Sequence, residues 1–408
     1  MVAVLSVTLA VTSQLPKTIV RKIIFINSHP IQYFAPLYRY MNKQGAQVAA
    51  WYASGREDQG LDKEFGLAIK WDIPLLEDYE YRFFGNNSWK PSHANGFWGL
   101  INLSMIVALF RIPKSVLIVH GWHYFTHLAI IMLGRLNGHT VCVRNETPLC
   151  HEKLKSGWKQ TLKRFGLKYM LFPRIDYFLY IGNQNRLFYQ SYHIDDKRLV
   201  RCPYAVDNER FSDTCYDTAA IKAKLGIPAT DRIILYSGKY IPKKRPLDLL
   251  RAFEALNAAN CWLVMVGEGE LREQMEQYTV EHQLKQVILT GFVNQSVIAE
   301  YYAVCDVFVM CSTLGETWGL SVNEAMNFDA PVIVSDLTGC SDDLVVEGSN
   351  GYVFKTGDVT ELATKLRQVL VNGSLSWRKS SKEVVADYSY STILSNVLSI
   401  PEVSNGSV

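Results

Sequence analysis

The chain has 408 residues, of which 48% are hydrophobic and 20% charged, and its formal net charge is +3. This composition excludes a mainly disordered or fibrous protein and predicts a globular chain of two domains, or three. The charge is uneven, because residues 1–200 carry 24 Lys and Arg against 13 Asp and Glu, whereas residues 201–408 carry 18 against 26. The two halves are therefore expected to differ in their electrostatic roles.

The first segment, residues 1–21, contains the apolar run 2–11 but has no basic residue before that run and no convincing cleavage context. We therefore expect a poorly ordered extension rather than an export signal. This run and another at residues 100–110 are shorter than the roughly 18–20 residues that a membrane-spanning helix needs. Any membrane contact is expected to be peripheral.

From Lys22 onward, short apolar runs alternate with longer amphipathic stretches, a pattern typical of parallel strands with crossover helices. The rhythm restarts after Asn208. The predicted strands are 23–27, 46–52, 115–120, 140–144 and 177–181 in the first half and 233–237, 262–267, 287–290, 307–310 and 331–335 in the second. This pattern predicts an α/β fold of two doubly wound, Rossmann-like domains, with the boundary in residues 201–210 and a cleft between the sheets.

His120 ends the predicted strand 115–120, so we expect it where a strand tip meets the interdomain cleft. We interpret it as a substrate contact rather than a core histidine. His120, His123 and His127 could also be metal ligands, but no acidic or thiol residue nearby completes such a set.

Residues 153–168 interleave six Lys and Arg with Leu154, Trp158, Leu162, Phe165 and Leu167. This composition is typical of a helix lying on an anionic bilayer. The pattern fits equally well a solvated basic face whose apolar side packs into the domain. Nucleic acid is not expected as a partner, because no recognition motif accompanies the charge.

In the second half, Gly238 and Lys239 follow the predicted strand 233–237, and Lys244 lies five residues further on. Gly238 allows a tight exit from the strand, and the two ammonium groups could reach one phosphate pair. A solvated basic loop explains this motif equally well when it is considered alone.

Two further strand ends carry glycines. Residues 266–269 (VGEG) form a G-x-G turn at Gly267 without the third glycine of a dinucleotide site, and Thr290 is followed by Gly291, Phe292 and Val293. Backbone groups and the Phe292 ring could lie near a nucleotide base. Ordinary strand-to-helix turns explain both motifs about as well.

The most informative stretch is residues 315–326 (GETWGLSVNEAM), directly after the predicted buried strand 307–310 and a short turn. A helix beginning near Gly319 would aim its free amides and positive dipole end at the strand tips, which suits a diphosphate. Glu316 in the loop and Glu324 inside the helix could then line one pocket. Capping and solvent-facing carboxylates are the alternative interpretation.

In order and spacing, these motifs resemble the retaining family-four glycosyltransferases of the GT-B fold. The resemblance covers most of residues 205–370, including NGYVF at 350–354. The first half is similar to a bacterial polysaccharide-type branch of that family through HPIQYFAPLYR at 29–39 and WDIPLL at 71–76.

The resemblance implies that residues 22–204 form the acceptor-side domain and 205–384 the nucleotide-sugar domain, with a C-terminal helix at about 385–400 returning to the first domain. It implies transfer of a sugar, with retention, from a nucleotide-sugar donor to a sugar or lipid-linked hydroxyl acceptor. Such an enzyme would lie in the cytoplasm or on the inner face of the membrane, in cell-surface polysaccharide or glycolipid synthesis. A sugar-nucleotide isomerase of the same fold is the alternative, and a catalytically silent nucleotide-binding protein is a third.

Site residues follow from the same resemblance. Glu324 would hold the ribose hydroxyls, Glu316 would lie against the transferred sugar, and His120 would touch the sugar or acceptor. The amides of Gly319, Leu320 and Ser321 would hold the diphosphate.

The family usually has Arg and then Lys as its phosphate clamp, whereas this chain has Lys239 and Lys244, which keep the charge but not the bidentate geometry. No Asp-x-Asp motif and no C-x-x-C pair occurs in the sequence, although it contains eight cysteines. The cysteines are expected to be reduced thiols. We expect no metal or other cofactor, with positive charge supplied by the two lysines and the helix end.

Overall fold

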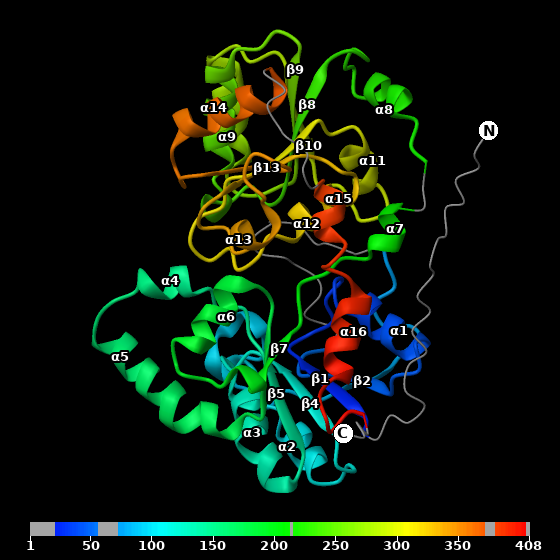
Figure 1. The fold of residues 1–408 in the computed structure, drawn as a ribbon, viewed down its shortest axis with the longest axis vertical. Helices are drawn as coiled ribbons and strands as arrows, with labels where there is room; N and C mark the ends of the chain where they lie inside the picture. Colours follow the sequence, from blue (N-terminus) through cyan, green and yellow to red (C-terminus); the bar gives the residue numbers. More distant parts are fainter. Residues whose placement is uncertain (1–20, 56–71, 213–214, 372–379, 405–408) are drawn as a thin grey trace, which may run out of the picture.

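The computed structural model describes residues 21–55, 72–212, 215–371 and 380–404. The predicted extension 1–21 lies outside these ranges apart from Arg21. Two lobes, each with its own sheet, are stacked one above the other (Figure 1).

Both sheets are parallel throughout the described ranges. The first has the order β3-β2-β1-β4-β5-β6-β7 and the second β10-β9-β8-β11-β12-β13. In each, the first strand of the domain lies beside the fourth and the order reverses there, as in doubly wound dinucleotide-binding folds. The predicted fold class is confirmed.

The strands of the first sheet are β1 (Ile23–Asn27), β2 (Val48–Tyr52), β3 (Glu80–Phe83), β4 (Val116–His120), β5 (Thr140–Arg144), β6 (Tyr177–Tyr180) and β7 (Leu199–Arg201). Those of the second are β8 (Arg232–Ser237), β9 (Cys261–Val266), β10 (Val287–Gly291), β11 (Val307–Met310), β12 (Val332–Ser335) and β13 (Gly351–Phe354). The ten predicted strands are all present, with bounds shifted by two residues at most. Sequence analysis missed the edge strands β3, β7 and β13, which are short and, in β3, mostly exposed.

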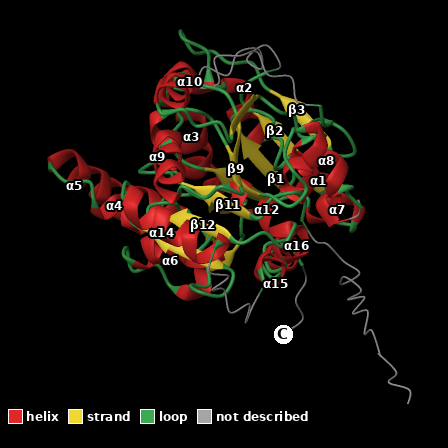
Figure 2. Cartoon of the chain, turned by 90° about the horizontal axis from the view of Figure 1, so that it is seen from above, coloured by secondary structure: helices red, strands yellow, loops and turns green. Residues whose placement is uncertain are grey.

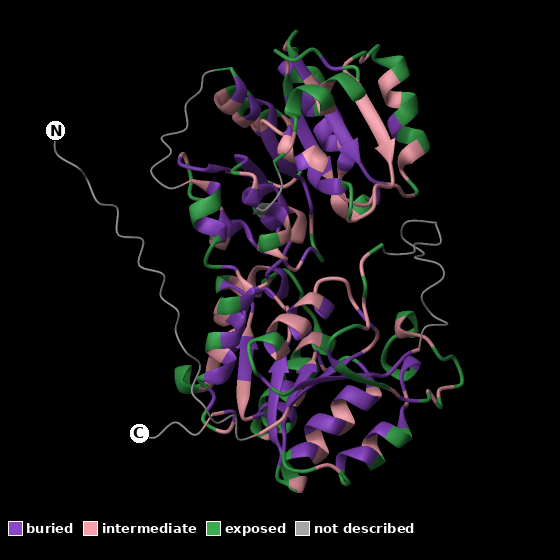
Figure 3. Ribbon diagram, turned by 90° about the vertical axis from the view of Figure 1, so that its right-hand side faces the viewer, coloured by how far each residue is buried: buried purple, intermediate pink, exposed green. Residues whose placement is uncertain are grey.

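Central strands are runs of Ile, Val and Leu because helices cover them on both faces. Strands β1, β4, β11 and β12 are buried along almost their whole length, and Figure 3 shows the same for most of both sheets. Four apolar clusters result, one on each face of each sheet. Seen from above, helices lie on both sides of the strands (Figure 2).

The helices of the first lobe are α1 (Ala35–Lys43), α2 (Leu103–Leu109), α3 (Phe125–Gly134), α4 (Leu149–Lys153), α5 (Trp158–Phe165) and α6 (Asn183–Gln190). The second lobe follows with α7 (Asn208–Ser212), α8 (Thr218–Lys224), α9 (Pro246–Leu256), α10 (Arg272–Glu281), α11 (Ile298–Ala303), α12 (Leu320–Asn327), α13 (Ser341–Leu344), α14 (Val359–Leu370) and α15 (Ser381–Val385). Helix α9 begins with a proline, whose missing amide and fixed φ suit a first helical position. Within the described ranges, no helix is long and apolar enough to cross a membrane.

The last helix, α16 (Tyr390–Leu398), crosses back to the first lobe, where it packs on α1 and β7. Its residues Ile393, Leu394 and Val397 join the cluster around Phe25 of β1. Helix α15, just before it, packs on α12. The chain therefore connects the two lobes twice, once before α7 and once between α15 and α16 (Figure 1).

Candidate functional site

Helix α12 begins directly at the carboxyl edge of the second sheet. Gly319, which precedes it, has φ 107°, and a Cβ there would lie 2.6 Å from Sδ of Met310, the last residue of β11. Only glycine allows both this backbone and this close approach. The first amides of α12 lack intrahelical carbonyl partners, so the helix brings donors and its positive dipole end to the strand tips, as predicted.

Glu316 and Lys244 form an ion pair beside this helix start. Lys244 Nζ contacts Glu316 Oε2, which also accepts a hydrogen bond from Ser312 Oγ at 3.3 Å. Both charged side chains are largely buried. The Thr313 amide donates to the Lys243 carbonyl at 2.9 Å, which ties the Glu316 loop to the turn that carries Lys244. The structure thus brings together the carboxylate and one of the two lysines that the sequence analysis selected.

Three glycines align the ends of β8, β9 and β10. The Gly238 amide donates to the Val266 carbonyl at 2.9 Å, and the Gly267 amide donates to the Gly291 carbonyl at 3.0 Å. A Cβ on Gly267 would lie 1.9 Å from the Gly238 carbonyl oxygen. Any side chain at Gly267 would therefore push two loops apart, and the loop that carries Lys239 would move with Gly238.

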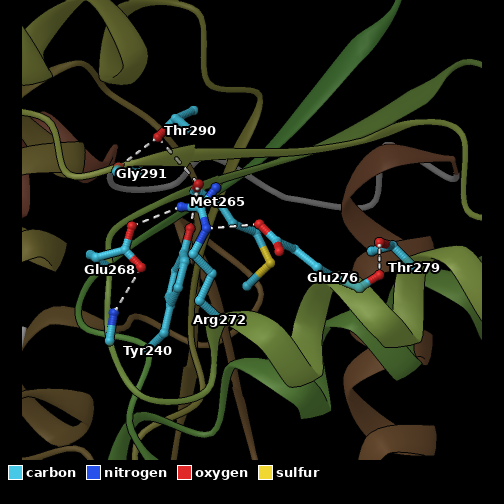
Figure 4. Close-up of polar contacts among 9 residues, drawn as sticks. Tyr240, Met265, Glu268, Arg272, Glu276, Thr279, Thr290 and Gly291 are labelled. Carbon is cyan, nitrogen blue, oxygen red and sulfur yellow. Dashed lines mark hydrogen bonds and ion pairs between the residues drawn. The ribbon is translucent and has the colours of Figure 1, made fainter.

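Arg272 of α10 lies beside this glycine edge. Its guanidinium donates to Glu268 Oε2 and Glu276 Oε1, each at 2.8 Å, next to Thr290 and Gly291 (Figure 4). This cation is thus engaged by two carboxylates. Beyond Gly291, Phe292 and Val293 are half-buried, and Val293 packs against the apolar core.

Glu324 lies in a second polar cluster. It is buried, accepts hydrogen bonds from Tyr302 (2.7 Å) and Tyr33 (3.4 Å), and has its pKa raised by burial. Tyr302 lies beside Ser237, which directly precedes Gly238. Glu324 and Glu316 share no hydrogen-bond partner within the described residues. Their common pocket therefore stays a prediction.

His120 ends β4 as predicted and is half-buried, with its Nε2 atom removed from solvent. Its Nε2 atom has no hydrogen-bond partner in the part of the chain that the structure describes, and the Phe34 ring lies edge-on with centroids 4.5 Å apart. Burial lowers the pKa of His120 well below its ordinary value, and Arg144 and His127 lower it further, so the imidazole is neutral. Among the described residues, no group of three or more His, Cys, Asp or Glu side chains is placed to hold a metal ion, and this applies to His120, His123 and His127.

Sequence reasoning missed Glu146, which follows β5 of the first lobe. Its Oε2 accepts a hydrogen bond at 3.0 Å from Thr317, the neighbour of Glu316, and its Oε1 accepts from Tyr204 and from Arg144 at 3.4 Å. Arg144 also lies over the Tyr204 ring, 4.2 Å from its centroid. A carboxylate of the first lobe thus holds the Glu316 loop of the second. The only signal in the sequence was its position just after a buried strand.

Further contacts join the lobes around this point. The Asn183 amide donates to Asp343 at 2.9 Å, and His151 Nε2 contacts the Leu337 carbonyl at 2.7 Å. Elsewhere along the interface, the Ser296 amide donates to Asp72 at 3.1 Å.

A cavity of about 610 Å³ lies elsewhere, between α1, residues 206–209 and the start of α16. It is lined by Tyr40, Asp207 and Tyr390 among others, and none of the predicted site residues lines it. It marks the place where the two connections between the lobes run side by side.

Residues 217–384 match the family model described as glycosyl transferases group 1. Among curated relatives, sulfoquinovosyl transferase SQD2 of Arabidopsis thaliana is 30% identical over 169 residues, which are 40% of this chain and 32% of that protein. The alpha-monoglucosyldiacylglycerol synthase of Acholeplasma laidlawii is 28% identical over 186 residues, 43% of this chain and 46% of that protein. The chain thus spans a third to a half of the length of these relatives.

Solved structures match over nearly the whole chain. Anabaena Alr3699/HepE in complex with UDP-glucose has a TM-score of 0.68 at 14% identity, covering 93% of this chain and 99% of that one. WaaG, a glycosyltransferase involved in lipopolysaccharide biosynthesis, has a TM-score of 0.62 at 14% identity, covering 94% and 100%.

The architecture is therefore that of the GT-B glycosyltransferases. Residues 217–384 match the glycosyl transferases group 1 family, so the resemblance inferred from the motifs of the second half is confirmed there.

The contact between Glu146 and Thr317 gives a first prediction. We expect Glu146→Ala to speed hydrogen exchange in residues 313–319 and to lower the free energy of unfolding by about 1–3 kcal/mol, because the Thr317 and Arg144 donors lose their acceptor. Glu146→Gln keeps an acceptor oxygen and should preserve most of the protection. Glu300→Ala, which removes a surface ion pair of the second lobe, is the control. Unchanged exchange in Glu146→Ala would contradict the role given to this carboxylate.

Proposed function

We propose that the protein is a retaining glycosyltransferase that moves a sugar from a nucleotide-sugar donor to a hydroxyl acceptor. The observation that carries the proposal is the Lys244–Glu316 pair at the start of α12, inside a domain of the glycosyl transferases group 1 family. The pair puts a largely buried cation and a carboxylate where the helix presents its first amides, an arrangement that suits a sugar diphosphate.

The chemical task is to stabilise a nucleoside diphosphate as it leaves the anomeric carbon. Developing negative charge on the leaving oxygen would meet the amides of Gly319, Leu320 and Ser321 and the ammonium of Lys244. An ammonium has three donors, so Lys244 can keep its contact with Glu316 while it reaches a phosphate oxygen. Lys239, on the loop that Gly238 and Gly267 fix, would supply the second positive charge.

Glu316 would then position hydroxyls of the transferred sugar rather than attack it. Its ion pair with Lys244 holds the carboxylate oriented as an acceptor. Glu324 would accept hydrogen bonds from the ribose hydroxyls. These would replace a hydrogen bond that Glu324 now accepts from the phenol of Tyr33 or Tyr302. Gly267, Gly291, Phe292 and Val293 would lie along the nucleotide.

His120 would contact the sugar or the acceptor. A neutral imidazole whose Nε2 has no partner among the residues that the structure describes can donate or accept one hydrogen bond with a hydroxyl, and its position at the tip of β4 suits the acceptor side. The acceptor would be a sugar or a lipid-linked sugar in polysaccharide or glycolipid synthesis, met in the cytoplasm or at the inner face of the membrane. The names of SQD2 and the monoglucosyldiacylglycerol synthase support this class.

A sugar-nucleotide isomerase of the same fold is the other function considered. The match of residues 217–384 to the glycosyl transferases group 1 model does not favour it. An assay that follows both sugar transfer and epimerisation with one nucleotide sugar distinguishes the two.

Glu316 provides the sharpest test of the proposed chemistry. We expect Glu316→Gln to lower the release of nucleoside diphosphate from UDP-, GDP-, ADP- or dTDP-sugars at least about a hundred-fold, because oriented groups at the reacting sugar act mainly on the transition state. Affinity for the nucleoside diphosphate should be unchanged or higher, since Lys244 loses its competing carboxylate. Turnover equal to that of the wild type would refute the role of Glu316.

The absence of an Asp-x-Asp motif gives a separate prediction. Because Lys239, Lys244 and the start of α12 would supply the positive charge, we expect full activity in the presence of EDTA. The measurement is sugar transfer with and without chelator, followed by addition of manganese. Complete loss in EDTA that manganese restores would show that a metal carries the charge instead.

A further inference from the structure

A helical arm projects from the first lobe. It starts at α4, continues through α5 and ends in a wider helical turn at residues 166–171 and a short one at Phe172–Arg174. Figures 1 and 2, which are views at right angles, both show α5 at the outer edge of the molecule.

Polar side chains join the two helices of the arm to each other. Glu152 of α4 is buried and accepts hydrogen bonds from Lys155 (2.6 Å), Gln160 (2.6 Å) and Lys163 (2.9 Å). Burial alone would raise the pKa of Glu152, but these hydrogen bonds outweigh it and hold the pKa at about 2. The carboxylate therefore stays ionised and fastens α5 by one of its polar sides.

The apolar side chains of the arm face outward instead. Trp158, Leu162 and Phe165 follow at spacings of four and three, which places them on one side of α5, and the Tyr169 ring lies 4.9 Å from that of Phe165. These four residues are 72, 62, 57 and 60% exposed. The alternative in which the apolar side of this segment packs into the domain is therefore wrong for them, although Leu167 is buried.

A second apolar stripe continues from the end of the arm. Arg135 donates to the Pro173 carbonyl at 2.8 Å and Asn137 to the Leu109 carbonyl at 2.8 Å, so Leu136 lies between the arm and α2. Leu136 is 71% exposed. Helix α2 adds an exposed stripe at the same spacing: Leu103, Val107 and Phe110. We name these exposed apolar residues the docking face: Trp158, Leu162, Phe165, Tyr169, Leu136, Leu103, Val107 and Phe110.

The charge around the docking face has one sign. Residues 149–174 contain seven Lys and Arg and a single acidic residue, the buried Glu152. Lys159 lies over the Trp158 ring (5.8 Å) and Lys168 over the Tyr169 ring (5.5 Å). Aromatic and aliphatic side chains flanked by ammonium groups match the boundary between acyl chains and anionic headgroups.

We propose that the docking face binds the surface of an anionic lipid bilayer. A second copy of this chain fits less well, because a symmetric contact would bring the cationic side chains beside the docking face, such as Lys159 and Lys168, close to those of the other copy. Binding of nucleic acid would not use the exposed leucines and phenylalanines. Lipid binding itself does not depend on the proposed sugar transfer. The consequence of binding for access to membrane-embedded acceptors does rest on the proposed function. Helix α4 touches the second lobe through His151, so docking would hold the interdomain site close to acceptors embedded in the membrane.

The test is cosedimentation of the full chain with vesicles of phosphatidylcholine and phosphatidylglycerol. We expect binding at low salt that weakens as salt is raised, and little binding to phosphatidylcholine alone. Lys159→Glu combined with Lys168→Glu should lower the partition coefficient at least about five-fold. Trp158→Ser combined with Phe165→Ser should lower it at least about ten-fold.

Matched controls carry the same kinds of change on the second lobe. Lys285→Glu and Val280→Ser alter an exposed cation and an exposed apolar residue there and should bind vesicles like the wild type. All altered side chains are exposed, and thermal unfolding of each variant checks that the fold is kept. Three outcomes would each overturn the proposal. The wild type does not bind anionic vesicles, or the controls lose as much binding as the docking-face variants. The third is that the wild type forms a dimer that dissociates only in the Trp158/Phe165 variant. Sugar transfer is assayed separately with a soluble acceptor, so loss of docking and loss of activity are distinguishable.

Discussion

The ion pair of Lys244 and Glu316 is the interaction on which the second lobe's site depends. Both side chains are largely removed from water, and an unpaired charge there would cost several kcal/mol, on the order of the penalty for breaking a buried pair. The pair therefore fixes the turn after β8 against the loop after β11. Because that loop opens α12, the same contact sets where the helix presents its first amides.

Two further sets of contacts hold this arrangement. One is close backbone packing within the second lobe, and the other is hydrogen bonding from the first lobe across the interface. Gly267 and Gly319 let two strand ends approach other elements at distances that no side chain would permit. Glu146 accepts a hydrogen bond from Thr317, and Tyr33 donates one to Glu324. Both ends of the 316–324 segment are therefore held by residues of the first lobe. In a two-lobe protein, such contacts couple the relative position of the lobes to the geometry of the site.

Much of this could be predicted from the sequence because it depends on local patterns. Buried strands such as β4 and β12 show as apolar runs, and the glycine before α12 predicted the start of that helix within one residue. The edge strand β3 escaped prediction because water covers most of it and removes the apolar pattern. Partnerships between distant residues escaped as well. The sequence motifs assigned Lys244 to the diphosphate and Glu316 to the transferred sugar. Their pairing with each other, and the roles of Glu146 and Tyr33, depend on tertiary contacts between segments that lie up to 291 positions apart.

The most direct measurement of the central claim is calorimetric titration of nucleoside diphosphates into Lys244→Met, alone and in the Glu316→Gln background. UDP, GDP, ADP and dTDP are first compared by thermal shift, and the one that stabilises the wild type most is titrated. If Lys244 grips the diphosphate, Lys244→Met weakens binding at least about ten-fold in both backgrounds, the loss expected for one charge-assisted hydrogen bond. Wild-type affinity in Lys244→Met, with Glu316 present or replaced, would contradict the account.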